Sequence, residues 1–117
     1  MLEVSPASVS MTLAISTVVK YSLLDAREIA SKLLDERLAA CCNIPVKEVD
    51  SRFWWKGKRE RQDEWRLIVK TRAGLFDACA SAIRAAHPYE TPAIFGFKVD
   101  FADEATAAWV AECCRED

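Results

Sequence analysis

Apolar positions near the start of the chain change from a strand-like to a helix-like spacing. Residues 12–19 (TLAISTVV) are apolar and rich in β-branched side chains, which predicts a buried strand. Ser22 with Asp25 resembles a helix-capping box in which Asp replaces the usual Glu. The segment that follows predicts an amphipathic helix, because charged residues fill the face opposite its apolar positions. Those positions are Ala26, Ile29, Ala30, Leu33, Leu34 and Leu38.

The middle of the chain predicts a strand, a hairpin and a returning strand. Residues 41–44 form a short strand that Pro45 interrupts, since proline cannot donate a ladder hydrogen bond. The strand resumes over residues 49–55, and Gly57 supplies a positive-φ position for the hairpin turn. The returning strand places four residues on one face: Trp65, Leu67, Val69 and Thr71.

A second helix precedes the loop that contains the only histidine of the chain. Gly74 opens this helix, and Pro88 ends it because proline disfavours helical geometry at the preceding His87. The expected apolar stripe consists of Phe76, Cys79, Ile83 and Ala86.

A last strand and a short helix complete the predicted elements. The strand covers residues 94–101, and Asp103 caps the helix behind it. Alternation places Phe95, Phe97, Val99 and Phe101 on one strand face, which we interpret as a core face. The apolar residues of the short helix are Ala105, Ala108, Trp109 and Cys113.

This order of elements, β-α-β-β-α-β with an extra C-terminal helix, predicts an α+β fold of the ferredoxin-like class. The two helices follow the first and third strands, so each helix connects two strands of the same sheet. Both helical crossovers can therefore cover one face of an antiparallel sheet. We expect a single domain over residues 11–117, preceded by a disordered tail at residues 1–10.

Composition excludes several classes of function. The 117 residues carry a net charge of −2, which argues against a protein whose main partner is a phosphate backbone. No apolar run is long enough for a membrane span, and we expect neither a nucleic-acid nor a membrane partner. One histidine excludes any site that needs two imidazoles from one chain. The five cysteines include no C-x-x-C, so a zinc knuckle and a thioredoxin-type motif are absent.

Three segments resemble one known family. Residues 38–41 (LAAC) enter a strand after the first helix, residues 53–58 (FWWKGK) form the hairpin, and residues 87–92 (HPYETP) precede the last strand. In this order and spacing they resemble the CutA family of divalent-cation tolerance proteins, over about residues 12–112. The resemblance implies a ferredoxin-like fold, a homotrimer similar to the PII signalling proteins, and copper or another divalent metal as ligand. It implies no established catalytic activity. The lack of a membrane span and of a signal-peptide pattern separately predicts a cytoplasmic location.

The resemblance also assigns candidate metal ligands, and this chain departs from the family pattern at some of them. Ser16 and Ala86 stand where relatives carry a cysteine and a histidine, and Ala93 stands where many relatives carry a glutamate. His87 and Cys41 remain as the candidate metal ligands, although a buried thiol on a strand is more often a small hydrophobic side chain. The resemblance places an inter-subunit cleft at Trp55, Lys70, Tyr89 and Glu90.

The aromatic hairpin predicts an interface independently of the resemblance. Phe53, Trp54 and Trp55 place aromatic side chains on both faces of one strand, and two helices can cover only one face of a sheet. We therefore expect these three residues at a trimer interface. The alternative is that the terminal helix covers the second face within the chain, through Trp109.

His87 has a structural and a functional interpretation. It ends a helix, so it could cap the carbonyl groups there or hydrogen-bond across a subunit contact. It could also bind metal, or form an acid–base pair with Glu90 in an enzyme for a small molecule held by Tyr89. A third hypothesis is an interaction module whose trimer only presents surfaces.

Overall fold

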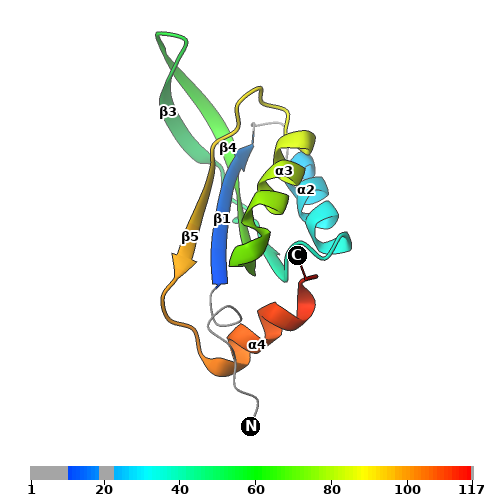
Figure 1. The fold of residues 1–117 in the computed structure, drawn as a ribbon. Helices are drawn as coiled ribbons and strands as arrows, with labels where there is room; N and C mark the ends of the chain where they lie inside the picture. The colour runs from blue at the N-terminus through cyan, green and yellow to red at the C-terminus, as the bar shows by residue number, and fades with distance from the viewer. Residues whose placement is uncertain (1–10, 19–22, 117) are drawn as a thin grey trace.

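The computed structural model describes residues 11–18 and 23–116 of the chain (Figure 1). The predicted tail at residues 1–10 and the helix cap at Ser22 lie outside these residues. The described elements are β1 (Met11–Val18), α2 (Leu23–Asp35), β2 (Cys41–Asn43), β3 (Val49–Trp55), β4 (Lys58–Arg72), the 3-10 turn η1 (Ala73–Leu75), α3 (Phe76–Ala86), β5 (Ile94–Val99) and α4 (Glu104–Cys113).

The strands form one antiparallel arrangement in the order β2-β4-β1-β5, with β3 also paired to β4. Strand β1 pairs with β4 and β5 on its two sides, so its Met11 lies opposite both Arg72 and Val99. Both helical crossovers, α2 and α3, lie on one face of the sheet (Figure 1). This is the predicted α+β, ferredoxin-like architecture with an additional C-terminal helix.

The 15-residue strand β4 pairs with different strands along its length. Its first half pairs with β3 from Val49↔Glu64 to Trp55↔Lys58, and its second half pairs with β1. The β3–β4 hairpin therefore extends beyond the end of β1 (Figure 1). Gly57 (φ 79°) and Lys56 (φ 49°) both adopt left-handed backbone conformations, which is the geometry of a two-residue hairpin turn. The turn predicted at Gly57 is confirmed.

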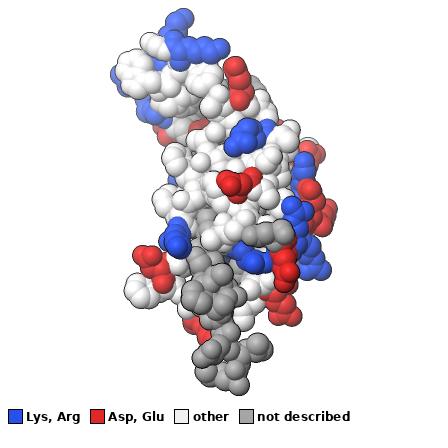
Figure 2. Space-filling view, viewed as in Figure 1, with Lys and Arg blue, Asp and Glu red and all other residues white. Residues whose placement is uncertain are grey.

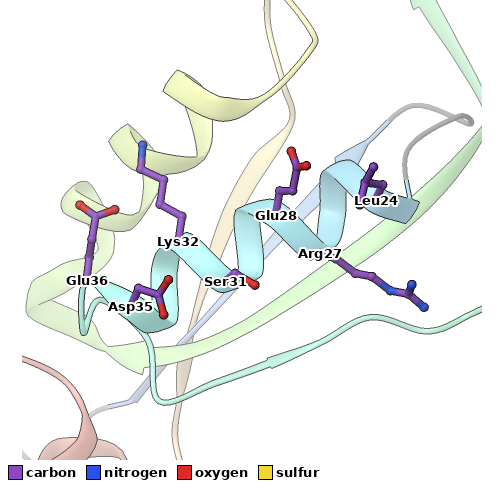
Figure 3. Close-up of a pocket in the computed structure, with 7 residues that line it drawn as sticks. All are labelled: Leu24, Arg27, Glu28, Ser31, Lys32, Asp35 and Glu36. Carbon is purple, nitrogen blue, oxygen red and sulfur yellow. The ribbon is translucent and has the colours of Figure 1, made fainter.

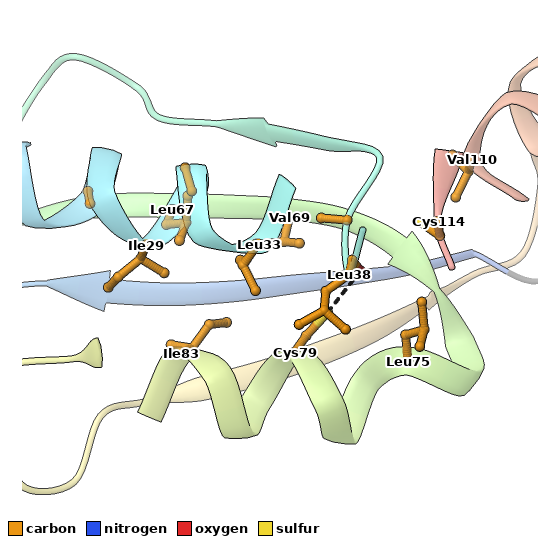
Figure 4. Close-up of a cluster of buried hydrophobic side chains, with 13 residues drawn as sticks. Ile29, Leu33, Leu38, Leu67, Val69, Leu75, Cys79, Ile83, Val110 and Cys114 are labelled. Atoms are coloured by element: carbon orange, nitrogen blue, oxygen red, sulfur yellow. Dashed lines mark hydrogen bonds between the residues drawn. The ribbon is translucent and has the colours of Figure 1, made fainter. Parts of the chain in front are cut away.

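The core lies between the helices and the sheet (Figure 4). Helix α2 buries the predicted residues from Ala26 to Leu33, but Leu34 is exposed. The helix ends at Asp35, and Arg37 adopts a left-handed φ of 58°. The Leu38 N–H donates to the Leu33 carbonyl at 2.9 Å, which turns Leu38 back into the core beyond the helix. In α3, Cys79 and Ile83 are buried as predicted, whereas the terminal Ala86 is exposed.

The predicted apolar stripe of α4 is wrong. Ala107 and Val110 are its buried residues, whereas Trp109, Ala105 and Ala108 are exposed. Helix α4 contacts β4 at the end of the sheet remote from the hairpin, so a different side of the helix meets the core (Figure 1). Its predicted cap is confirmed, because the Asp103 side chain accepts a hydrogen bond of 2.9 Å from the Thr106 N–H.

The interpretation of Phe95, Phe97 and Phe101 as core residues is also wrong for the single chain. Phe95 is 60% exposed, Phe97 is 52% exposed, and Phe101 lies almost fully in solvent beyond the strand. A Cβ atom at Gly96 would lie 2.4 Å from the Phe76 ring of α3, so Gly96 faces the helices. Phe95 and Phe97 occupy the sheet face that carries no helix, whereas Val99 is partly buried and packs against the core as predicted.

Candidate functional site

The aromatic hairpin is uncovered within the chain. Phe53 and Trp55 are more than one-third exposed and Trp54 is 71% exposed. Cross-strand partners alternate between faces, with Trp54 opposite Arg59 and Trp55 opposite Lys58. Helix α4, which carries Trp109, lies at the opposite end of the molecule (Figure 1). The alternative in which Trp109 covers these aromatic side chains is therefore wrong.

The helix-free face of the sheet carries a second exposed apolar region. Phe95 and Ile68 both pair with position 15 of β1, from its two sides, and therefore share one face. Phe97 and Lys70 pair in the same way with position 13. This open face combines exposed aromatic rings with a lysine at the centre of the sheet.

Basic side chains gather at the hairpin end of the molecule (Figure 2). Arg61 is ion-paired with Asp50 at 3.0 Å and with Asp63 at 2.6 Å, and these carboxylates raise the pKa of its guanidinium. Arg52 also contacts Asp50, at 3.4 Å. Part of the positive charge of the hairpin is therefore balanced by acidic residues on the same face.

His87 is held in one tautomer by the loop that follows α3. Its side chain is 8% exposed, and its Nδ1 accepts a hydrogen bond of 3.0 Å from the Tyr89 N–H. A hydrogen bond accepted at Nδ1 occupies the lone pair of that nitrogen and favours the imidazole tautomer with its proton on Nε2. The His87 and Tyr89 rings also contact each other, with centroids 4.9 Å apart.

Tyr89 connects this loop to a buried carboxylate on β4. The Tyr89 hydroxyl donates a hydrogen bond of 2.8 Å to Glu64 Oε2, and Glu64 is only 5% exposed. Burial of the phenol, followed by the bond to Glu64, raises the pKa of Tyr89 above its ordinary value. Sequence reasoning missed Glu64, because nothing in a single sequence shows that a loop 25 residues later reaches this carboxylate.

The other side of the same loop contacts the hairpin turn. Glu90 forms an exposed ion pair of 3.8 Å with Lys56, whose ammonium lies 5.6 Å from the centroid of the Trp55 ring. Exposed pairs of this kind stabilise little. The contacts nevertheless bring three of the four predicted cleft residues, Trp55, Tyr89 and Glu90, into one region of the chain.

The fourth cleft residue, Lys70, lies elsewhere, beside Cys41. These two residues are register partners on β4 and β2, and the Cys41 thiol contacts Asn43 Oδ1 at 3.4 Å. Lys70 is six positions from Glu64 along β4, which corresponds to roughly 20 Å of extended strand. Cys42 points to the opposite face, toward the Ala30 carbonyl at 4.0 Å, and burial raises its pKa to about 12.

The described part of the chain contains no ready-made metal site. Within residues 11–18 and 23–116, no group of three or more His, Cys, Asp or Glu side chains could hold a metal ion. His87 lies near Glu64 and Cys41 lies beside Lys70, so one chain does not bring the two candidate ligands together. The side chain at Ser16 lies outside the described side chains, and Ala86 and Ala93 offer no donor atom.

A shallow depression runs along the outer side of α2 (Figure 3). Its lining residues recur every three or four positions on one helix and are mostly charged. Such a pattern is typical of a solvated helix face, and we assign it no role. They are Leu24, Arg27, Glu28, Ser31, Lys32, Asp35 and Glu36.

Comparison with known proteins places the whole domain in one family. Residues 14–113 match the model of the CutA1 divalent ion tolerance protein family. The divalent-cation tolerance protein CutA of Archaeoglobus fulgidus is 40% identical over 92 residues, which cover 78% of this chain and 87% of that protein. The relative of the same name from Thermotoga maritima is 45% identical over 75 residues, or 64% of this chain and 72% of that protein.

Solved structures agree with this assignment. The CutA1 structure from Oryza sativa superimposes with a TM-score of 0.86 at 30% identity and covers 93% of this chain and 97% of that chain. The structure described as the periplasmic divalent cation tolerance protein CutA from Archaeoglobus fulgidus gives 0.82 at 35% identity, with 88% and 97% covered. No helix in the described ranges is long and apolar enough to cross a membrane. The chain belongs to the CutA1 divalent ion tolerance family.

Proposed function

We propose that the protein is a cytoplasmic homotrimer that binds a divalent metal ion, preferentially copper, in grooves between its subunits. The observation that carries this proposal is the uncovered aromatic surface of the single chain, formed by the hairpin and by Phe95 and Phe97 on the open sheet face. Monomeric proteins rarely expose large apolar patches. Neighbouring copies of the chain would bury them, and a closed ring is the ordinary result of such association.

Association of the chains would also explain how Cys41 and His87, which lie far apart in one chain, could bind the same metal ion. Cys41 lies on the open face beside Lys70, whereas the His87 loop reaches Glu64, six positions earlier along β4. A thiolate and an imidazole suit copper, and both would reach one ion only if different subunits contribute them. A neutral imidazole offers one lone pair, so His87 would bind the ion only once the Tyr89 N–H releases Nδ1. In this proposal Tyr89 and Glu64 position the His87 loop, and Glu90 ties that loop to the hairpin.

Metal tolerance then follows from buffering of copper, and a PII-like trimer would also present metal-dependent surfaces to other proteins. An acid–base pair of His87 and Glu90 receives no support from the contacts, because Glu90 is ion-paired with Lys56 and the His87 Nδ1 accepts a backbone hydrogen bond. The relatives are named as tolerance proteins and not as enzymes.

Equilibrium titration with copper tests the metal site. We expect wild-type protein to bind copper at micromolar concentration, and His87→Ala and Cys41→Ser each to weaken binding. Cys113→Ser is the matched control, because Cys113 is a comparably accessible thiol at the remote end of the molecule. Binding curves that are identical for the wild type, His87→Ala and Cys41→Ser would show that neither residue binds copper.

A further inference from the structure

Two buried thiols that are far apart in sequence meet at one side chain of β4. The Cys79 sulfur of α3 and the Cys114 sulfur, just beyond α4, each lie 3.8 Å from the Thr71 hydroxyl oxygen. The two sulfur atoms are therefore separated by no more than twice 3.8 Å. Cys79 is fully buried and Cys114 nearly so, and Figure 4 places both in the hydrophobic cluster.

The polar groups of this cluster are hydrogen-bonded to one another. The Leu38 carbonyl accepts hydrogen bonds from the Thr71 hydroxyl at 2.5 Å and from the Cys79 thiol at 3.2 Å. Burial is the main cause that raises the pKa of the Cys79 thiol. The adjacent cysteines of the sequence thus have different environments: Cys113 remains partly exposed, whereas Cys114 turns into the core.

Three arginines surround the segment that carries Cys114. The Arg37 guanidinium donates to the Cys113 carbonyl at 3.4 Å, and Arg72 donates to the Arg115 carbonyl at 3.0 Å. The Arg115 N–H donates to the Arg37 carbonyl at 2.7 Å, and the Arg115 charge acts to lower the pKa of Cys79. These positive charges would offset the negative charge of thiolates formed at this end of the core.

We propose that Cys79 and Cys114 together bind one soft monovalent metal ion, Cu(I) or Ag(I), in two-coordinate geometry. Each thiol loses its proton to solvent as a metal–sulfur bond forms, and no electron is transferred because the ion arrives already monovalent. If the zinc–thiolate distance of about 2.3 Å is taken as a guide, a linear site would place the two sulfurs about 4.6 Å apart. Both side chains would have to rotate toward each other, which gives up the contact of the Cys79 thiol with the Leu38 carbonyl and the contacts of both sulfurs with the Thr71 hydroxyl.

The number of donors decides the class of metal. Zinc in structural sites takes four ligands, and no group of three candidate ligands exists among residues 11–18 and 23–116. Thiolates select Cu(I) among the softer ions, and two sulfurs can complete its coordination. The ion would enter when the segment from Cys114 to Glu116 opens locally, which breaks the hydrogen bonds of Arg115 with Arg37 and Arg72.

The experiment uses a background in which the partly exposed thiols are removed, Cys41→Ser with Cys113→Ser. Cu(I) is titrated into this protein without oxygen, in competition with the chromogenic chelator bathocuproine disulfonate. We expect one Cu(I) per chain. Addition of Cys114→Ser should lower the affinity at least about 100-fold, because even changes outside the ligand shell cost about 10- to 100-fold. Cys42→Ser is the matched control and should leave the affinity unchanged.

Copper K-edge X-ray absorption of the loaded protein provides a second measurement that needs no core variant. We expect two sulfur neighbours and no nitrogen neighbour. Binding that survives Cys114→Ser, binding that disappears in Cys42→Ser, a nitrogen neighbour, or no bound Cu(I) would each overturn the proposal. Because the background lacks Cys41, this result is independent of whether Cys41 and His87 hold a divalent ion between subunits.

Discussion

The hydrogen bond between Tyr89 and Glu64 gives a prediction about the loop that holds His87. Tyr89→Phe removes only the hydroxyl, which donates a bond of 2.8 Å to a carboxylate that is 5% exposed. Hydrogen bonds to charged groups contribute about 1.5–3 kcal/mol, so we expect the free energy of unfolding to fall by about that amount. The phenylalanine ring preserves the contact with the His87 ring, so the fall in the free energy of unfolding measures the contribution of the hydroxyl group alone.

The contribution of Tyr89 to the free energy of unfolding should decrease at high pH. The folded-state pKa of Tyr89 is raised above its ordinary value of 10.0, chiefly by burial. A raised pKa means that the unfolded chain loses this proton first, so the stabilisation is fully present below pH 10 and declines as the pH rises above 10. The stability difference between wild type and Tyr89→Phe should therefore be constant from pH 7 to pH 9 and shrink above pH 10.

Urea unfolding followed by tryptophan fluorescence, at one fixed protein concentration, measures these differences. The matched control is Glu64→Gln, in which the hydroxyl can donate only to a neutral oxygen. In that background Tyr89→Phe should cost less, about 0.5–1.5 kcal/mol. An equal cost of Tyr89→Phe in both backgrounds, or a difference that grows above pH 10, would refute the assignment of this hydrogen bond.

Two further substitutions test the packing and the backbone. Gly96→Ala should lower the free energy of unfolding by about 1–3 kcal/mol, because the new methyl group would lie 2.4 Å from the Phe76 ring. Phe76→Leu in the same chain should recover part of this loss. A neutral effect of Gly96→Ala in thermal unfolding would contradict the close approach. Arg37→Gly should be more stable than Arg37→Ala by about 1 kcal/mol, because only glycine adopts the left-handed φ of 58° without steric cost. Equal urea midpoints for the two Arg37 variants would show that this conformation carries no strain.

The secondary structure could be predicted from the sequence because it depends on local spacing. The order of elements, the turn at Gly57 and the cap at Asp103 are confirmed. Alternation also placed Phe95 and Phe97 on one face, but it could not show whether that face is covered. Coverage depends on where distant elements pack, and the single chain leaves this face open.

The site was harder to predict for the same reason. The stripe of α4 was wrong because the short helix meets the end of β4 with a side that its sequence does not distinguish. Glu64 and Cys114 were missed because their partners, Tyr89 and Thr71, lie 25 and 43 positions away. His87 was singled out from the sequence, but its bond to the Tyr89 N–H depends on the loop conformation, which the sequence does not show.

The central claim is that copies of this chain cover the aromatic surface formed by Phe53, Trp54, Trp55, Phe95 and Phe97. Multi-angle light scattering of dilute protein tests it most directly. The account predicts a mass three times the 13.1 kDa of the chain, and predicts that Trp54 fluorescence is shielded from a soluble quencher in that species. A stable 13.1 kDa monomer with a freely quenched Trp54 would contradict it.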